Sequence, residues 1–211
     1  MRDNLLLHVC CGPCSVAIFE ELSQEFDVTV HFCNSNIHPE EEYEKRKQEV
    51  VKLCEELNLP FVEEDYNPKE WFKKTEEFKN EPEGGKRCPV CFEMRLEKSA
   101  QYASKHAFDW LATSLTSGRN KYADIINPIG LAVAKKYGIK FFEEDWKKGR
   151  PAFASSSSKA SADKKATAGK QESRQEKATR LVNEKGIYRQ DYCGCTYSRP
   201  ATHTTRHKKT A

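Results

Sequence analysis

Seven of the nine cysteines lie in three short clusters, and this arrangement restricts the possible folds more than any other feature of the chain. The clusters are Cys10-Cys11-Gly12-Pro13-Cys14, Cys88-Pro89-Val90-Cys91 and Cys193-Gly194-Cys195. Thiols clustered in this way are typical of a metal or redox centre. The fold must therefore bring together three segments that are far apart in the sequence. The other two cysteines, Cys33 and Cys54, stand alone, and we expect both to be small buried core residues.

The expected compartment decides how the clustered thiols are interpreted. The first residues do not resemble a secretory signal peptide, and no apolar run approaches the ~20 residues that span a membrane. We therefore expect a cytoplasmic protein that does not enter a membrane. In a reducing compartment, clustered cysteines are typical of metal ligands or catalytic thiols rather than of structural disulfides.

The alternation of apolar strands with helical segments predicts an α/β fold. We expect strands at residues 5–9, 27–32, 59–62, 108–115 and 139–142, and helices at 14–26, 40–57, 68–78, 92–106, 122–137 and 174–184. Strands separated by helices predict a doubly wound, mainly parallel five-stranded sheet, with the strand order 3-2-1-4-5. The first cysteine cluster then follows the first strand, at the edge of the sheet where such folds bind ligands.

Composition divides the chain into four parts. Residues 1–149 are expected to form the α/β domain with the first two cysteine clusters. Residues 150–173 are rich in Ser, Ala and Lys, which predicts a flexible linker or loop. Residues 174–198 are expected to bring the last cysteine pair back to the site, and residues 199–211 to form a disordered basic tail.

Charge is distributed unevenly along the chain. Residues 1–146 contain 19 Lys/Arg and 27 Asp/Glu, a net charge of −8, whereas residues 147–211 contain 16 Lys/Arg and 5 Asp/Glu, a net charge of +11. A basic region attached to an acidic body indicates a polyanionic partner such as RNA. A solvated flexible tail is an equally good interpretation of the charge alone.

The number of clustered thiols narrows the kind of centre. A structural zinc ion and a 4Fe-4S cluster each take four protein ligands, so seven cysteines exceed either requirement by three. The surplus favours a second metal, or thiols that take part in chemistry beside the first. A structural zinc with spare cysteines is the alternative. Asp191 precedes the last cysteine pair and is either an oxygen ligand for iron or a surface turn residue.

Four motifs together resemble the cobalamin-independent epoxyqueuosine reductases, the QueH family. They are residues 7–15, residues 34–39 followed by Glu42, Tyr43 and Arg46, residues 83–96, and residues 188–195. The resemblance covers residues 5–149 and about 174–198. It implies a fold like that of the nucleotide-binding ATP pyrophosphatases, which is a Rossmann-like fold, with a C-terminal cysteine-bearing segment that closes over the site.

The resemblance also implies an activity, which is the reduction of epoxyqueuosine to queuosine at the tRNA wobble position, the last step of queuosine biosynthesis. Because an iron–sulfur cluster transfers one electron at a time, a 4Fe-4S cluster beside a mononuclear iron is expected to supply both electrons and a Lewis acid. The expected ligands are Asp191 and the seven clustered cysteines, Cys10, Cys11, Cys14, Cys88, Cys91, Cys193 and Cys195. An electron-donor protein or another reductant is required as a partner, in addition to the tRNA.

The remaining candidate site residues are polar or aromatic. Asp191, Tyr188 and Tyr192 are the expected catalytic residues, and both tyrosines and His8 are possible proton donors. The expected substrate-binding residues are His8, Asn36, Glu42, Tyr43, Arg46 and Arg189. Glu42, Tyr43 and Arg46 have an equally good structural interpretation, because they can brace the start of their helix.

Two rival classes of function stay open at this point. An ATP-using tRNA-modifying enzyme of related fold needs a Gly- and Ser-rich phosphate loop where Cys10–Ser15 stands, and cysteines there argue against it. A zinc-stabilised RNA-binding module needs zinc in place of iron. The metal content of anaerobically purified protein distinguishes this class from a reductase.

Overall fold

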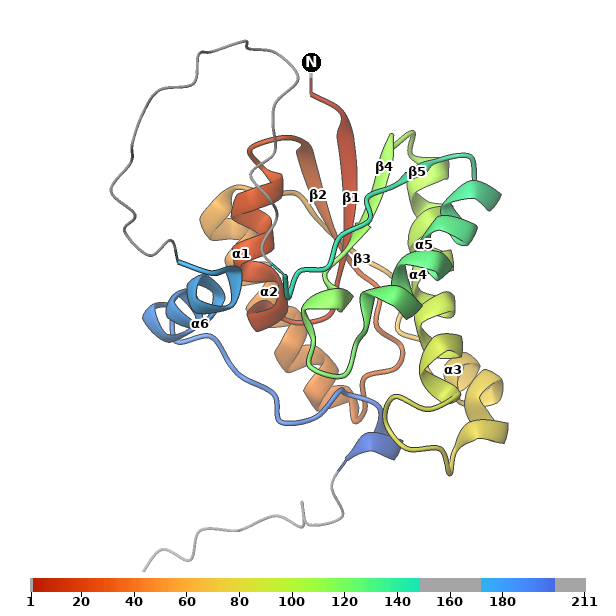
Figure 1. Ribbon diagram of the computed structural model, residues 1–211. Helices are drawn as coiled ribbons and strands as arrows, with labels where there is room; N and C mark the ends of the chain where they lie inside the picture. Colours follow the sequence, from red (N-terminus) through yellow and green to blue (C-terminus); the bar gives the residue numbers. More distant parts are fainter. Residues whose placement is uncertain (1, 149–171, 200–211) are drawn as a thin grey trace, which may run out of the picture.

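A computed structural model describes residues 2–148 and 172–199 and contains a parallel β-sheet (Figure 1). Its strands are β1 (Asn4–Val9), β2 (Asp27–Phe32), β3 (Phe61–Glu63), β4 (Trp110–Thr113) and β5 (Lys140–Phe141). Every strand pair is parallel, and the order β3-β2-β1-β4-β5 confirms the predicted topology. Most of the predicted linker and almost all of the predicted tail lie outside the described residues.

Strand β1 occupies the centre of the sheet because its side chains are apolar on both faces. Leu5, Leu6 and Leu7 are fully buried, as expected for a strand that is covered on both sides. Leu5 and Leu7 belong to the core on one face, and Leu6 belongs to the core on the other. The end of β1 is therefore held rigidly by packing from two directions.

Helices cover the two faces of the sheet (Figure 1). One face carries α1 (Gly12–Leu22), α2 (Glu40–Leu57) and α6 (Arg174–Glu184), and the other carries α4 (Arg87–Lys105) and α5 (Ala123–Lys136). The short helix α3 (Pro68–Thr75) packs against α4. After α6 the chain runs past the carboxyl ends of the strands toward α4 (Figure 1), as predicted for the segment that carries the last cysteines.

Helix α4 begins earlier than predicted. The predicted helix starts at residue 92, but the observed helix starts at Arg87, so Cys88 and Cys91 lie in its first turns. The reason is the position of Pro89. In the first turn of a helix, backbone N–H groups have no intrahelical partner, so a proline there removes no hydrogen bond and need not end the helix.

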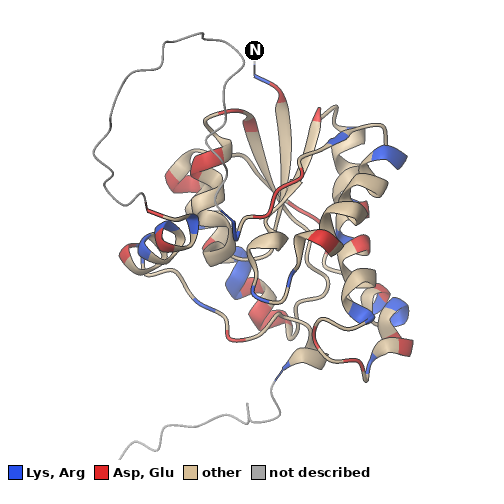
Figure 2. Cartoon of the chain, in the orientation of Figure 1, with Lys and Arg blue, Asp and Glu red and all other residues tan. Residues whose placement is uncertain are grey.

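Charged side chains of both signs are mixed along the outer helices (Figure 2). Residues 172–199 contain 6 Lys/Arg and 4 Asp/Glu. Most of the basic excess of the C-terminal region therefore belongs to residues outside the described ranges. In the described ranges, no helix is both long enough and apolar enough to cross a lipid bilayer.

Candidate metal centre and adjoining cavity

The first cysteine cluster forms the junction between β1 and α1. Cys10 directly follows the strand, Cys11 is the N-cap of the helix in an extended conformation, and Cys14 lies in the first turn. The three sulfur atoms lie within 4.8 Å of one another, and the Sγ atoms of Cys10 and Cys11 are 3.8 Å apart. We call Cys10, Cys11 and Cys14 the thiol trio. Its closeness follows directly from the turn between strand and helix.

Hydrogen bonding within the thiol trio separates the pKa values of its members. Hydrogen bonds from the Cys11 and Cys14 thiols lower the pKa of Cys10 well below its ordinary value. The charges of Lys121 and Arg95 act in the same direction. The same hydrogen bonding raises the pKa of Cys11, and it raises the pKa of Cys14 to about 11. The arrangement favours a thiolate at Cys10, which is the form of cysteine that binds metals.

The other clustered cysteines lie around the thiol trio. Cys88 packs against the small core that contains Cys10 and Cys11. Cys91 and Cys195 share a second small core with Trp71 and Met94. Cys193 lines a cavity together with Cys10 and Cys14. The fold therefore brings the seven cysteines among the predicted metal ligands to one edge of the sheet, and it brings the thiol trio closest together.

The C-terminal segment, residues 186–199, is held in place by side chains of the α/β domain. The guanidinium of Arg46 donates to the carbonyl oxygens of Cys193 at 3.1 Å and Tyr192 at 3.2 Å. The Gln190 amide donates to Cys11 Sγ at 2.9 Å. Gly194 has a φ of +109°, and a Cβ there would lie 2.9 Å from Ile37. A glycine is therefore required where the segment turns between its two cysteines.

A cavity of about 390 Å³ opens beside the thiol trio. Its lining is mainly polar and charged, and it consists of Cys10, Cys14, Arg46, Glu83, Gly118, Arg119, Asn120, Lys121, Gln190, Asp191, Tyr192 and Cys193. The volume falls within the range of small-molecule sites. The cavity thus places three basic side chains, two carboxylates and a tyrosine next to thiols that can bind metal.

Lys121 is a site residue that the sequence analysis missed. Its side chain is only 9% exposed and lines the cavity beside the thiols. Burial disfavours its charge, but the nearby Cys193, Cys10 and Cys14 thiols outweigh burial and raise its pKa. The only sequence signal was a polar loop that follows a strand at the carboxyl edge of the sheet. That signal does not distinguish Lys121 from its neighbours.

Arg95, from α4, is a second buried cation at the site. It is 3% exposed and donates to the Asn34 side chain, which in turn donates to the Val9 carbonyl at 2.7 Å. Burial would lower its pKa, but the charges of Cys91 and Cys10 raise it. The thiols therefore lie in a buried environment that contains compensating positive charge.

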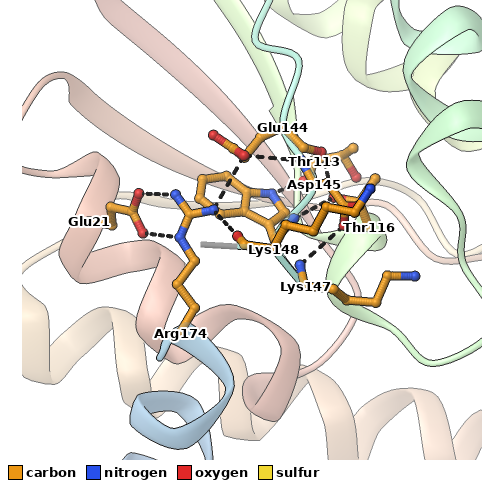
Figure 3. Close-up of polar contacts among 9 residues, drawn as sticks. Glu21, Thr113, Thr116, Glu144, Asp145, Lys147, Lys148 and Arg174 are labelled. Carbon is orange, nitrogen blue, oxygen red and sulfur yellow. Dashed lines mark hydrogen bonds and ion pairs between the residues drawn. The ribbon is translucent and has the colours of Figure 1, made fainter. Parts of the chain in front are cut away.

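Arg174, at the start of α6, fastens this helix to the domain (Figure 3). Its guanidinium pairs with Glu21 of α1, lies 3.3 Å from the Glu144 carboxylate and donates to the Lys148 carbonyl at 2.9 Å. It also stacks over the ring of Trp146, 4.9 Å from the ring centroid. These contacts fix the point from which the chain returns to the site, and the sequence analysis did not identify Arg174.

The predicted catalytic residues lie in the C-terminal segment. Asp191 and Tyr192 line the cavity beside the thiols. The hydroxyl of Tyr188 instead donates to the Glu42 carboxylate at 3.1 Å, and Lys45 lies over its ring. Tyr192 donates to the His38 carbonyl. Of the two tyrosines, Tyr192 is therefore the one placed at the cavity wall.

The predicted substrate-binding residues are distributed differently. Arg46 lines the cavity, and its Nε donates to Glu42 at 2.7 Å. Tyr43 is buried and donates to Glu63 at 2.8 Å. Glu42, Tyr43 and Arg46 thus make the bracing contacts that their positions in the sequence also allow. Their role toward substrate stays a prediction.

Three further predicted substrate-binding residues lie away from the cavity lining. His8 is fully buried between strands, with Nδ1 2.9 Å from Thr113 Oγ1, and burial lowers its pKa. Asn36 is 1% exposed and lines a separate small hollow beside α3. Arg189 is on the surface, near Asn183. These positions put His8 beneath the site and Arg189 outside it.

The isolated cysteines agree with their predicted structural role. Cys33 and Cys54 are each 2% exposed. Burial raises the pKa of both thiols to about 12. Both are therefore kept in the protonated form and packed as small apolar side chains, as predicted.

Comparison with known proteins identifies sequence relatives along nearly the whole chain. The model of the family described as "Epoxyqueuosine reductase QueH" matches residues 5–167 and 154–201. The epoxyqueuosine reductase QueH of Streptococcus pyogenes serotype M1 is 37% identical over 204 residues, which is 94% of this chain and 71% of the relative. The QueH of Acinetobacter baylyi is 36% identical, covering 93% and 80% of the two chains. The QueH of Thermotoga maritima is 33% identical, covering 92% and 90%.

Proposed function

The chain belongs to the epoxyqueuosine reductase QueH family, and on this premise we propose that it reduces epoxyqueuosine in tRNA with iron held by its clustered cysteines. The activity makes the protein an oxidoreductase of tRNA queuosine biosynthesis. The observation that carries the proposal is the cavity of about 390 Å³ whose lining includes thiols from both ends of the chain, Cys10 and Cys14 with Cys193. An ATP-using enzyme is not favoured, because the loop after β1 presents thiols where phosphate would need glycines.

The closest thiols at the site fit a tetrahedral metal site. A tetrahedral site with metal–thiolate bonds of about 2.3 Å places its sulfur atoms about 3.8 Å apart. The Cys10 and Cys11 sulfur atoms have this separation. The buried cations Arg95 and Lys121 compensate thiolate charge. We propose that a 4Fe-4S cluster and a separate iron share the seven clustered cysteines, and that Asp191 supplies an oxygen ligand.

The reaction removes one oxygen atom from the substrate. The two carbon–oxygen bonds of the epoxide break, a carbon–carbon double bond forms, and the oxygen leaves as water after uptake of two electrons and two protons. When bound, iron supplies electrons one at a time and acts as a Lewis acid toward the epoxide oxygen. The electrons come from an external donor protein or chemical reductant.

The protein's own residues position the base and exclude water. An anticodon-loop base is unpaired, so moving it into a pocket costs little free energy. The Tyr192 ring offers a stacking surface at the cavity wall, with the Arg46 guanidinium 5.2 Å from the ring centroid. Arg119 lines the same cavity and is suited to bind a phosphate. Tyr192 is also the candidate donor of a proton to the departing oxygen, because it lines the cavity, and its hydroxyl must then leave the His38 carbonyl.

Metal analysis of anaerobically purified protein, followed by a tRNA assay, tests this proposal. We expect iron and acid-labile sulfide, a brown visible spectrum, and queuosine formation from epoxyqueuosine-containing tRNA when a strong reductant is supplied. Zinc without iron or sulfide would instead support the RNA-binding alternative. Iron without turnover on any epoxyqueuosine-containing tRNA would contradict the assigned reaction.

A further inference from the structure

We propose that Lys121 is a catalytic residue, whose ammonium donates a hydrogen bond to the epoxide oxygen of the bound substrate and stabilises the negative charge that develops on that oxygen. The inference rests on the proposed function, because it concerns the oxygen atom that the reaction removes. It gives a direct role toward substrate to a buried lysine that otherwise serves only to compensate the charge of the thiolates.

The Lys121 ammonium lies at the cavity wall without an acceptor of its own. The residue is 9% exposed, and it lines the cavity of about 390 Å³ together with Cys10, Cys14 and Cys193. Within the described ranges, its Nζ makes no hydrogen bond and no ion pair. An ammonium carries three N–H donors, and burying it without an acceptor is unfavourable. The missing acceptor can come from a molecule that occupies the cavity.

Three other donors that line the cavity are already engaged. All three nitrogen atoms of the Arg46 guanidinium donate to groups of the protein. The Gln190 amide donates to a cysteine sulfur, and the Tyr192 hydroxyl donates to the His38 carbonyl. A substrate oxygen bound to one of these groups would share or displace a contact that holds the C-terminal segment. Lys121 can donate to such an oxygen without this loss.

The loop that carries Lys121 holds the ammonium in position. The Lys121 backbone N–H donates to the Gly118 carbonyl at 3.2 Å, and the Lys121 carbonyl accepts from Lys147 Nζ at 2.8 Å. A Cβ at Gly118 would lie 3.0 Å from Lys121 Cδ and 3.3 Å from its Nζ, so the side chain folds back over this glycine. A glycine at 118 therefore leaves room for the ammonium beside the cavity.

The reaction creates the charge that such a donor stabilises. Two electrons enter the substrate as the epoxide opens, and negative charge develops on the oxygen when its first bond to carbon breaks. A positively charged donor that is fixed in a site with little water stabilises this oxygen more than it stabilises the neutral epoxide. The oxygen takes up two protons and leaves as water, so the ammonium carries the same charge before and after the reaction.

The test compares two tRNAs that differ in this oxygen atom. Epoxyqueuosine-containing tRNA carries it and queuosine-containing tRNA lacks it, and without a reductant the affinity of the protein for each can be measured. In Lys121→Met we expect the affinity for the epoxyqueuosine tRNA to fall about tenfold more than the affinity for the queuosine tRNA, as for the loss of a hydrogen bond to a charged group. With reductant present, kcat should fall about 100-fold to 1,000-fold.

The ratio of the two affinities distinguishes contact with this oxygen from contact with the tRNA backbone. A lysine that bound only a phosphate would contribute equally to both affinities, because the two tRNAs have the same backbone. The matched control is Lys136→Met on α5, whose ammonium pairs with Glu97 at the surface. This control should leave both affinities and kcat unchanged.

A second variant separates substrate binding from charge compensation. Gly118→Ala keeps the positive charge beside the thiols but crowds the Lys121 side chain, and the φ of −71° at this position is open to any residue. We expect it to retain iron and to lose part of the preference for the epoxyqueuosine tRNA. An affinity ratio equal to that of the wild type in iron-loaded Lys121→Met, or in Gly118→Ala if the first variant loses its iron, would overturn the inference. A wild-type protein that contains no iron or forms no queuosine would instead overturn the proposed function, so the two failures are distinguishable.

Discussion

The two ends of the chain reach the same site by different physical means. The thiol trio is placed by the fold itself, because it joins the most buried strand to a helix that packs on the sheet. The C-terminal segment is placed by individual side-chain contacts, chiefly from Arg46 and Gln190, after a helix that Arg174 fastens. The thiol trio should therefore keep its position when the C-terminal segment is disturbed. The following experiments test this asymmetry.

The largest loss of activity is expected from removing the C-terminal segment, which is held by side-chain contacts. A chain that ends before Gly186 loses Cys193, Cys195, Asp191 and Tyr192, but it keeps the whole sheet and the helices that cover it. We expect a cooperatively folded domain without queuosine formation, even with a strong chemical reductant. Circular dichroism and thermal unfolding measure the fold, and nucleoside analysis of the tRNA measures the activity.

The matched control ends the chain after Arg199, which leaves all described residues in place. This control should retain activity apart from weaker tRNA binding at high salt, because basic residues beyond Arg199 would be lost. Substantial turnover by the shorter chain would show that the site is complete without its C-terminal half.

The next largest effect is the loss of iron and sulfide expected when a predicted ligand beside the thiol trio is replaced. Cys88 packs against the core of the thiol trio, and replacing its sulfur with oxygen in Cys88→Ser should abolish the brown chromophore. The control is Cys54→Ala, a buried cysteine in the core under α2, which should keep iron and sulfide content unchanged. Wild-type iron and sulfide in the Cys88→Ser protein would refute the assignment of this ligand.

A smaller loss of activity is expected from removing the contact between Arg46 and the C-terminal segment. In Arg46→Met, the carbonyl oxygens of Tyr192 and Cys193 lose their charged donor, which costs about 1.5–3 kcal/mol for hydrogen bonds to a charged group. We expect a 10–100-fold loss of activity, typical of losing a contact that orients a metal ligand.

The control for this contact is Lys47→Met, one residue later on α2, whose ammonium pairs with Glu44 and Glu63 instead of the C-terminal segment. Steady-state kinetics and iron content are measured for both variants. An equal loss of activity in the two would mean that Arg46 acts only through the stability of α2.

The same asymmetry explains which features could be predicted from the sequence. The limits of α2 and α6 follow from local sequence patterns, and the sheet order follows from the alternation of strands and helices with right-handed crossovers. These predictions were confirmed. The predicted start of α4, residue 92, was wrong, because Pro89 fits the first turn of a helix that begins at Arg87. Lys121 and Arg174 could not be identified, since their importance depends on which side chains of other segments they meet.

The predicted position of the last cysteine pair was reached by a functional argument and not by a local pattern. Nothing near Cys193 specifies that it meets Cys10, and the geometry arises from Arg46 and from the glycine at 194. Motifs in the sequence thus indicated the candidate ligands, whereas the contacts that hold them required the structure.

The smallest effect is expected from shortening the chain between Lys148 and Arg174. Arg174 donates to the Lys148 carbonyl, so the two points that flank residues 149–173 lie side by side (Figure 3). Deleting residues 151–171 leaves four residues to connect them, and four residues reach up to about 13–14 Å. Each halving of a flexible loop lowers its closure cost by about 0.6 kcal/mol, so stability should rise by about 1–2 kcal/mol at most. Iron content should be unchanged, because the deleted residues include no cysteine or histidine. Metal analysis and thermal unfolding check both expectations, and loss of iron would mean that the deleted stretch helps to hold the C-terminal half of the site.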